Sequence, residues 1–163
     1  QNVRELTDKQ LSHIRNKQIG FIFQGYNLIP ELTALENVEL PLIYQGIGPG
    51  KRQELAQRAL ERVGLGSRGG HRPSEMSGGQ QQRVAIARAI STSPPIIMAD
   101  EPTGALDSKT GQEVLAFLQQ LNREGSTVIL ITHDNGIAAT ARRIVRVSDG
   151  KIVEDHAQEV DWL

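Results

Sequence analysis

The chain has 163 residues, of which 38% are hydrophobic and 23% are charged, and its formal net charge is −1. This length is enough for one domain with a real core, and the balanced charge gives no electrostatic reason to expect a nucleic-acid partner. The sequence contains no cysteine, which excludes disulfides and thiolate metal sites and is compatible with a cytosolic location. No apolar run approaches the ~20 residues of a membrane-spanning helix. Because the sequence starts at Gln1 rather than at a methionine, a segment of a longer protein is one interpretation.

Capping residues, apolar runs and glycines predict helices that alternate with short strands. Helices are expected over residues 7–15, 33–44, 51–63 and 108–124, and from Ser77 to before Pro94; strands are expected over residues 19–23, 96–99, 127–131, 144–147 and 152–153. Pro41 should kink or interrupt the second helix. The strand over 96–99 is expected to be buried on both faces of a sheet, and that over 127–131 to be a second buried strand. Asp149-Gly150 is a hairpin signal, and Glu154–Leu163 shows no clear element.

The stretch from Met76 to Asp107 opens on a glycine turn that suits a phosphate. Ser77 is a good helix N-cap, and Gly78 and Gly79 lack the Cβ atoms that would block a close approach to the backbone. A helix that begins there directs free N–H groups and the positive end of its dipole at whatever lies in front of it. The turn is therefore a candidate binding site for an anionic ligand.

Three of the predicted strands deliver functional side chains at their carboxyl ends. These are Gln24, Asp100 with Glu101, and His133. Each alone has an ordinary interpretation: Gln24 as a loop amide, the two carboxylates as a helix start, and His133 as a packed histidine. Open α/β sheets keep their ligand sites at this edge, and an amide, two carboxylates and an imidazole are the groups needed to hold Mg²⁺ and position a water for phosphoryl transfer. Their joint arrival beside the glycine turn favours phosphate and metal chemistry.

These residues match, in order, the motifs of the ATP-binding cassette (ABC) ATPases, and the chain resembles that family over most of its length. Met76–Gln80 is similar to the family's LSGGQ signature, with Met in place of the usual Leu. Ile96–Glu101 resembles the Walker B strand with its catalytic glutamate, and Ala105–Asp107 resembles the D-loop. Gln24 corresponds to the Q-loop glutamine and His133 to the switch histidine. Several motifs in the family's own order make the resemblance specific.

The resemblance implies a role for each strand-end residue in ATP hydrolysis, with ATP and Mg²⁺ as cofactors. Asp100 would hold Mg²⁺ through its water shell, and Gln24 would sense the Mg²⁺ and the water. Glu101 would polarise the attacking water. His133 would contact the γ-phosphate.

The resemblance also implies a second ATPase subunit as a partner, because enzymes of this family work as head-to-tail dimers. Ser77, Gly78 and Gly79 would bind the γ-phosphate of a nucleotide held by the other subunit, and Gln80 belongs to the same nucleotide-binding turn. Asp107 would act across that interface. The chain is thus expected to contain parts of two different sites.

The fold implied by the resemblance is an α/β fold with a P-loop-NTPase-like, mostly parallel sheet that lacks its N-terminal strands. Residues 1–26 and 91–155 would form the core, residues 27–90 an inserted helical subdomain with the signature motif, and residues 156–163 a tail after a C-terminal β-hairpin. The wording of Asn27–Tyr44 and of Asp100–Lys109 is similar to macrolide exporters and lipoprotein-releasing transporters. The helical subdomain would dock on a transmembrane permease subunit, which implies a peripheral location on the cytoplasmic face of the inner membrane.

The family's P-loop, G-x-x-x-x-G-K-[ST], is expected before the Q-loop strand and does not occur there. Gly50-Lys51 is followed by Arg52 and comes after a helical stretch, so it is interpreted as a linker.

Because the P-loop supplies most of the grip on phosphates, the chain alone is expected to bind ATP weakly and not to hydrolyse it. Its glycine turn at Ser77, Gly78 and Gly79 would still complete a partner's site. The incomplete sheet is also expected to leave apolar surface uncovered.

Three functions are compatible with these observations. The favoured one is the ATPase motor of an exporter or lipoprotein-releasing transporter. The alternative is a degenerate, non-hydrolysing interaction module that docks on a membrane subunit. A chromosome-maintenance or DNA-repair ATPase ranks last, because such proteins insert long coiled coils and no heptad run is present.

Overall fold

A parallel β-sheet forms the centre of the structure. The computed structural model describes residues 5–160 of the chain. Three strands pair in the order β1-β2-β3, and both pairings are parallel. The strands are β1 (Ile19–Ile22), β2 (Ile96–Asp100) and β3 (Thr127–Ile131). The register pairs Ile22 with Ala99 and Asp100 with Ile131, so the three strands end at the same edge of the sheet.

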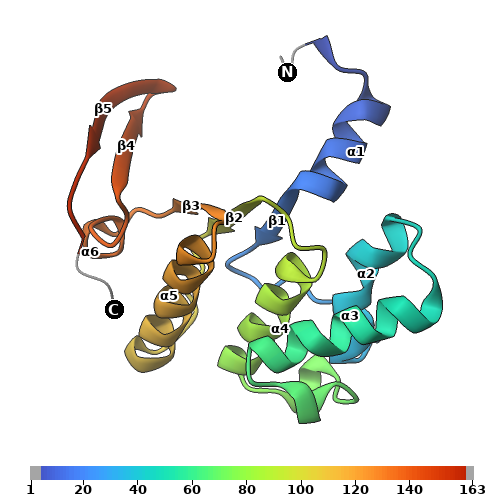
Figure 1. Cartoon of the computed structure of the whole chain (residues 1–163). Coiled ribbons are helices and arrows are strands. Elements are labelled where there is room, and N and C mark those ends of the chain that lie inside the picture. The colour runs from blue at the N-terminus through green and yellow to red at the C-terminus, as the bar shows by residue number, and fades with distance from the viewer. Residues whose placement is uncertain (1–4, 161–163) are drawn as a thin grey trace.

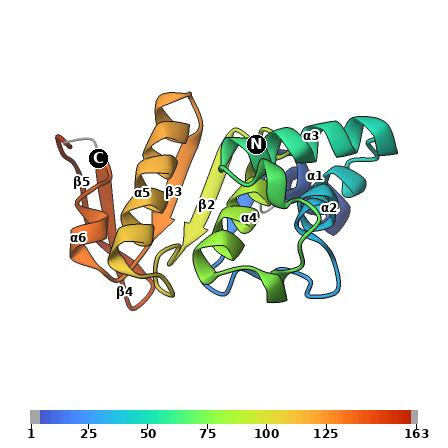
Figure 2. The ribbon, with the colours of Figure 1, turned by 90° about the horizontal axis from the view of Figure 1, so that it is seen from below.

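Helices cover one face of this sheet and form a cluster beside it. They are α1 (Asp8–Gln18), α2 (Ala34–Tyr44), α3 (Pro49–Arg62), α4 (Gly78–Ile90), α5 (Ser108–Arg123) and α6 (Asn135–Ala138), with two 3₁₀ turns, η2 (Gly66–Arg68) and η3 (Pro73–Glu75). In Figure 1, α4 and α5 lie below the sheet, and α2 and α3 pack against α4. An antiparallel hairpin of β4 (Arg143–Ser148) and β5 (Lys151–Ala157) stands at the other end of the molecule, as Figure 2 also shows. The expected α/β fold with a helical subdomain and a C-terminal hairpin is confirmed.

Local sequence signals explain where the helices begin and end. The side chains of Thr7, Thr33 and Ser77 each accept a hydrogen bond from the backbone N–H three residues on, at the start of a helix. In return, the side chain of that third residue accepts a hydrogen bond from the backbone N–H of the capping residue. Gly64 and Gly125 follow α3 and α5 with φ angles of +74° and +106°, which glycine adopts without strain. The predicted capping boxes and glycine helix stops are therefore confirmed.

The hydrophobic core lies between the sheet and the helices. Side chains that are almost completely buried include Ile22, Val38, Leu42, Leu60, Val84, Ile86 and Ile97. Val114, Leu118 and Leu121, predicted as the apolar stripe of α5, are buried as well. The helix α2 runs through Pro41 to its end, so the expected interruption at this proline does not occur.

At Gly20 the backbone of β1 packs directly on the backbone of α4. A Cβ atom placed on Gly20 would lie 2.3 Å from the carbonyl oxygen of Ala89 and 3.1 Å from Pro94 Cγ. Both distances are shorter than ordinary van der Waals contact, so only glycine fits. This close approach fixes β1, and the residues that follow it, relative to α4.

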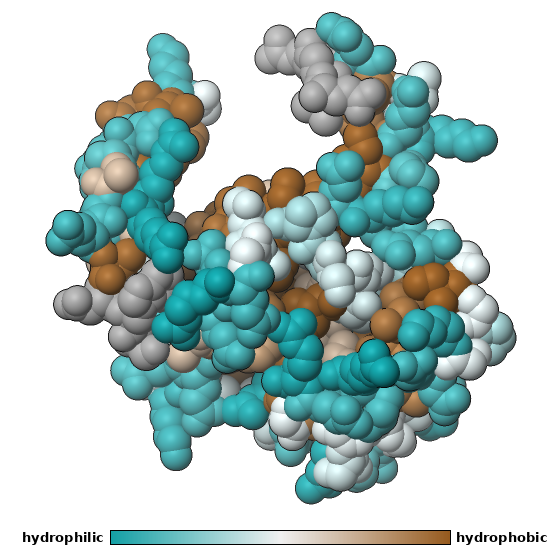
Figure 3. Space-filling view, viewed as in Figure 1, coloured by the Kyte–Doolittle hydropathy of each residue, from teal (hydrophilic) through white to brown (hydrophobic). Residues whose placement is uncertain are grey.

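The strands β2 and β3 are less buried than their apolar sequences suggest. In β2, Ile97 and Ala99 are buried but the alternate residues are half-buried. In β3, Ile129 and Ile131 are 42% and 45% exposed, because no described helix covers that face and β3 is the edge strand among residues 5–160. Figure 3 shows apolar surface on the floor of the hollow between the hairpin and α1. Burial on both faces is therefore wrong, whereas the expected uncovered apolar surface is present.

The last strand extends further than its sequence indicates. β5 continues to Ala157, where it pairs with Arg143, so the first two residues of the expected tail belong to the hairpin. Cross-strand ion pairs explain why a polar segment forms a strand: Arg143 binds Asp155 at 2.7 Å and Arg146 binds Glu154 at 2.8 Å. Residues 161–163 of the expected tail lie outside the described residues.

Replacing Gly20 with alanine should destabilise the fold, because the added methyl group collides with backbone atoms that cannot rotate away. We expect Gly20→Ala to lose about 1–3 kcal/mol of unfolding free energy, measured by chemical denaturation. The matched control is Gly50→Ala, at the start of α3, where no atom lies within 4 Å of the added methyl group. That variant should gain about 0.5 kcal/mol, since alanine is the better helix former. Equal stability of the two variants would contradict the close contact.

Candidate functional site

Two carboxylates follow one another at the end of β2. Asp100 is the last residue of the strand and is exposed. Glu101 has a φ angle of +45°, in the left-handed region that is unfavourable for a residue with a side chain. Its N–H still donates to the carbonyl of Ile131 at 2.9 Å, which continues the pairing with β3. The left-handed turn therefore directs the Glu101 side chain toward the residues that follow β3.

The carboxylate of Glu101 is held by the residues after β3. The N–H of His133 donates to Oε1 at 2.8 Å, and His133 Nδ1 lies 2.5 Å from the same oxygen. The hydroxyl of Thr132 donates to Oε2 at 3.2 Å. The side chain of Glu101 is 17% exposed, whereas that of His133 is 90% exposed. The carboxylate is thus anchored inside the site, and the imidazole forms its outer side.

Opposing effects act on the pKa of Glu101. Burial raises this pKa, because a carboxylate loses its hydration. The hydrogen bonds from the backbone and imidazole of His133, the charge of a protonated His133, and the hydroxyl of Thr132 all favour the ionised form. Together they outweigh burial, so the pKa of Glu101 lies below its usual range. Glu101 is therefore an ionised hydrogen-bond acceptor at neutral pH.

Gln24 lies against the loop that follows β2. A Cβ atom placed on Gly104 would lie 2.7 Å from Gln24 Nε2, so a glycine at this position lets the amide approach the loop. In residues 5–160, no group of three or more His, Cys, Asp or Glu side chains is placed to hold a metal ion. The expected ligands Asp100 and Gln24 supply one carboxylate and one amide oxygen. This set fits Mg²⁺, which keeps several waters and binds through one or two carboxylates plus substrate phosphates.

The glycine turn of the signature motif, Ser77 to Gln80, is called the signature turn here and forms the N-terminus of α4. Ser77 Oγ accepts a hydrogen bond from the N–H of Gln80 at 3.3 Å, and Gln80 Oε1 accepts one from the N–H of Ser77 at 3.0 Å. The side-chain carbonyl of Gln80 is therefore engaged in capping the helix. Ser77 and Gly78 are exposed, so the start of the helix faces solvent, as an anion-binding turn requires.

The two signature glycines let neighbouring elements pack closely on the start of α4. A Cβ atom on Gly78 would lie 2.9 Å from the hydroxyl oxygen of Tyr26, and one on Gly79 would lie 2.7 Å from Thr110 Cγ2. Asp107 caps α5, since its carboxylate accepts hydrogen bonds from the N–H and the hydroxyl of Thr110 at 3.0 and 2.7 Å. These bonds, led by that of the hydroxyl, lower the pKa of Asp107.

The site residues predicted from the sequence fall into two groups. Gln24, Asp100, Glu101 and His133 lie at the carboxyl edge of the sheet. Ser77, Gly78, Gly79, Gln80 and Asp107 lie at the N-termini of α4 and α5. Within the described part of the chain, no hydrogen bond or ion pair joins one group to the other.

Three further residues contact these groups, and their contacts could not be predicted from the sequence. Thr132 is visible as a residue after a strand, but its hydrogen bond to Glu101 depends on the pairing of β2 with β3. Tyr26 has a φ angle of +61°, and although Gly25 and Asn27 beside it are turn residues, a tyrosine itself gives no sign of a left-handed backbone. Thr110 looks like an ordinary residue in the first turn of a helix, and only the packing of α5 beside α4 brings it to the signature turn.

Comparison with protein families shows to which family the chain belongs. A family model described as "ABC transporter" matches residues 2–104, more than half of the chain. The family match and the fold identify the class of protein as an ATP-binding cassette. The chain belongs to the ABC transporter family.

Relatives of the chain are named as ABC transporter proteins, two of them for export. The chain is 53% identical to the macrolide export ATP-binding/permease protein MacB of Burkholderia thailandensis, over 96% of this chain and 25% of that protein. It is 56% identical to the probable syringafactin export ATP-binding/permease protein SyfD of Pseudomonas syringae pv. syringae, over 92% of this chain and 23% of that protein. It is 54% identical to the uncharacterized ABC transporter ATP-binding protein YknY of Bacillus subtilis, over 94% of this chain and 66% of that protein. The chain spans about a quarter of the length of the first two relatives.

Solved structures of a dimeric ATP-binding cassette have the same fold. One, in a post-hydrolysis state bound to ADP and Pi, superposes with a TM-score of 0.82 at 47% identity and covers 94% of this chain and 68% of that chain. A second dimeric structure, described as a bacterial ABC transporter cassette, gives a TM-score of 0.83 at 48% identity over 95% of this chain and 69% of that chain. These similarities confirm the fold expected from the sequence.

The lowered pKa of Glu101 predicts that this residue stabilises the fold in a pH-dependent way. The stabilisation is fully present above the pKa of the unfolded chain, about 4.3, and is lost as the pH falls through the lower pKa of the folded state. Relative to Glu101→Gln, the wild type should therefore lose unfolding free energy as the pH falls below about 4.3. Denaturation at a series of pH values measures this difference.

The control for this titration is Glu113→Gln, because Glu113 forms a solvent-exposed ion pair with Arg83. Exposed pairs contribute little to stability, so the same comparison should be nearly flat with pH. A flat difference for Glu101→Gln as well would show that its hydrogen bonds do not favour the ionised form.

Proposed function

We propose that this chain is part of the ATPase of an ABC exporter, which couples Mg-ATP hydrolysis at a head-to-tail dimer interface to export or to lipoprotein release. The observation that carries the proposal is the Glu101 carboxylate, held by His133 and Thr132 at the carboxyl edge of a parallel sheet. An ionised, mostly buried carboxylate at that edge fits a group that polarises a water for attack on a phosphate. The names of two relatives, for macrolide export and syringafactin export, support export as the direction of transport.

Four residues of one chain would serve the nucleotide bound at their own sheet edge. Glu101 would accept a hydrogen bond from the attacking water, and its lowered pKa keeps it ionised for this role. His133 would present the exposed edge of its imidazole to the γ-phosphate. Asp100 and Gln24 would hold Mg²⁺, which when bound neutralises charge on the phosphate oxygens.

The signature turn would serve the nucleotide of a second subunit. Ser77 and Gly78 face solvent at the start of α4, and free N–H groups at a helix N-terminus suit the γ-phosphate. Gly79 and Gln80 would complete that turn, and Asp107 would lie at the same interface. The similarity to cassettes solved as dimers supports this arrangement.

The proposed enzyme also needs a phosphate-binding loop, because such a loop and its lysine supply most of the grip on the phosphates. These 163 residues contain no G-x-x-x-x-G-K-[ST] motif. We therefore propose that the 163-residue polypeptide by itself binds ATP weakly and does not hydrolyse it. Turnover is accordingly tested in the intact transporter protein that contains such a loop.

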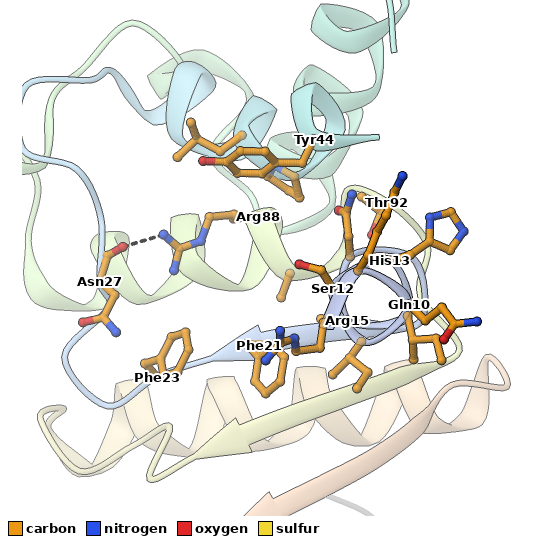
Figure 4. Close-up of a pocket in the computed structure, with 18 of the residues that line it drawn as sticks. Gln10, Ser12, His13, Arg15, Phe21, Phe23, Asn27, Tyr44, Arg88 and Thr92 are labelled. Carbon is orange, nitrogen blue, oxygen red and sulfur yellow. Dashed lines mark hydrogen bonds between the residues drawn. The ribbon is translucent and has the colours of Figure 1, made fainter. Parts of the chain in front are cut away.

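A groove between α1, β1 and α2 borders the helical subdomain, through which we propose that the chain docks on a membrane permease. Its volume is about 1030 Å³, and Figure 4 shows Phe21 and Phe23 on one side of it and Tyr44 on another. The two phenylalanine rings stack with centroids 5.8 Å apart, and Tyr44 is 76% exposed. Aromatic side chains exposed around a large groove are typical of a protein–protein contact.

The charged side chains among the described residues that line this groove are all basic. Lys9 and Arg15 come from α1, and Arg88 comes from α4. Arg88 donates to the carbonyls of Asn27 and Tyr26 at 2.5 and 2.9 Å, which stabilises the turn after Gln24. Within residues 5–160 the two α1 cations make no such bond, so the permease segment that docks here would present apolar side chains together with an acidic one.

Docking through this groove would place the chain at a membrane. None of the helices in residues 5–160 is long and apolar enough to cross a bilayer. We propose a peripheral position on the cytoplasmic face of the inner membrane, held by the permease. The names of the relatives MacB and SyfD join ATP-binding and permease parts in one protein.

Mixing two inactive variants of the intact protein tests the head-to-tail arrangement. Glu101→Gln removes the acceptor for the water, and Ser77→Arg fills the signature turn, so each variant alone should lose turnover. In a mixed dimer, one site joins the intact Glu101 of one chain to the intact Ser77 of the other. We expect the mixture to regain about a quarter of wild-type turnover, because about half of the dimers are mixed and each keeps one of two sites.

A control mixture uses Glu101→Gln with Glu113→Gln, which should lower turnover only by dilution, because neither Glu113 nor its exposed ion-pair partner Arg83 belongs to either group of site residues. Absence of any regained turnover in the first mixture would show that Glu101 and Ser77 do not act on one nucleotide across an interface. Absence of turnover in the unmodified intact protein would favour the non-hydrolysing interaction module instead.

Removing the exposed aromatic ring from the groove should weaken permease docking without unfolding the chain. We expect Tyr44→Ser to reduce association with the permease about tenfold or more, as an aromatic anchor at an interface does, and to leave thermal stability unchanged. Ile43→Ser is the matched control, because Ile43 is 44% exposed on the same helix but is not among the side chains that line the groove. Equal effects of the two variants on association would contradict docking in the groove.

A further inference from the structure

Gln82 is a polar side chain on a buried face of α4. It is completely buried, and its neighbours Val84, Ala85 and Ile86 are buried as well. Its amide nitrogen donates to the carbonyl oxygen of Pro102 at 2.6 Å. Pro102 is itself fully buried and directly follows Glu101. Helix α4 is thereby hydrogen-bonded to the backbone next to Glu101, the proposed catalytic carboxylate.

Packing alone does not explain a glutamine at this position. Its other amide atom, Oε1, is buried and has no hydrogen-bond partner among the described groups. A buried acceptor without a partner is unfavourable, and an apolar side chain of the same length would fill the space without one. The hydrogen bond to Pro102 is therefore what a glutamine provides here and a methionine would not.

The loop that Gln82 reaches is constrained from several directions. Thr132 and His133 hold the side chain of Glu101 from the end of β3, and Gln24 packs on Gly104 from the end of β1. The backbone of Glu101 has a φ angle of +45°, a conformation that persists only when its surroundings impose it. The bond from Gln82 fixes the carbonyl group of the very next residue.

We propose that Gln82 is a positioning residue for ATP hydrolysis, which holds the loop at Pro102 so that Glu101 reaches the attacking water. The inference rests on the proposed ATPase function and adds a residue that none of the motifs assigns. Gln82 acts through the backbone and does not itself contact the nucleotide. Because α4 begins at the signature turn, the same helix that serves the partner's site also supports the carboxylate of its own site.

The first test measures ATP turnover of Gln82→Met in the intact protein, because methionine keeps the length of the side chain and removes the amide. We expect kcat to fall about ten- to a hundredfold, as small misplacements of a reacting group do. KM for ATP should be unchanged, because no group that contacts the nucleotide is altered. Gln82→Leu is a second variant, and thermal unfolding identifies which of the two is folded.

The matched control is Gln119→Met. Gln119 is another buried glutamine, and its amide donates to a backbone carbonyl, that of Thr140, at 3.2 Å. Its partner lies outside the loop from Glu101 to Asp107, so a similar loss of a buried hydrogen bond should leave kcat unchanged. A role in stability alone would affect Gln82→Met and Gln119→Met alike.

Mixed dimers show which end of α4 Gln82 supports. In the mixture of Glu101→Gln and Ser77→Arg chains, Gln82→Met is added either to the chain with the working Glu101 or to the chain with the working Ser77. We expect the regained turnover to fall about ten- to a hundredfold in the first case and to persist in the second.

Two results would overturn the proposal. One is an unchanged kcat, or a fall no larger than that of Gln119→Met, in a folded Gln82 variant. The other is a loss of turnover that follows the chain with the working Ser77. Failure of the unmodified mixture to regain turnover would instead contradict the head-to-tail function, and the effect of Gln82→Met on kcat in the unmixed protein would still decide the role of Gln82.

Discussion

The way in which β2 ends is the constraint on which the site depends. Because β2 lies between β1 and β3, the loop after it borders the ends of both neighbouring strands. Glu101 enters that loop with a left-handed backbone, and its carboxylate then meets the donors of Thr132 and His133. Hydrogen bonds to an ionised carboxylate are among the stronger ones in proteins, and they offset the strain of the turn. A relaxed backbone at this residue would direct the carboxylate away from the donors.

Backbone contacts attach the helical cluster to the sheet. At Gly20 the strand β1 meets the backbone of α4, and Arg88 of α4 donates to the carbonyls of Tyr26 and Asn27, whose φ angles are +61° and +49°. Burial lowers the pKa of Arg88, yet a guanidinium titrates so high that it stays charged. The turn after Gln24 is therefore held by the same helix that begins with the signature turn. The two groups of site residues share one rigid support even though no hydrogen bond joins them within residues 5–160.

Features that depend on local chemistry were predictable from the sequence. Capping boxes, glycine helix stops and the alternation of helices with apolar strands led to the parallel sheet, and hence to the gathering of Gln24, Glu101 and His133 at one edge. Contacts between distant segments were not predictable: the bond from Gln82 to Pro102 spans 20 residues, and that from His133 to Glu101 spans 32. The strand β5 was missed in part because its polar residues are stabilised by ion pairs across the hairpin. Burial of β3 was overpredicted because an apolar sequence shows that a strand could be buried on both faces, not that other elements pack on both. The described helices cover only one face of the sheet.

The placement of Phe21, Phe23 and Gln24 within four residues, where β1 ends and a turn begins, has a mechanical consequence. The two aromatic rings line the groove, and the amide follows immediately at the carboxyl edge of the sheet. Gly20, just before them, is wedged against α4, so the segment cannot slide along the sheet by itself. Gln24 follows β1 in a turn whose next residues, Tyr26 and Asn27, are bonded to Arg88 of α4. A segment docked on the rings would therefore bear on chain that is anchored to α4 on both sides, so its force would pass to the helix that begins with the signature turn.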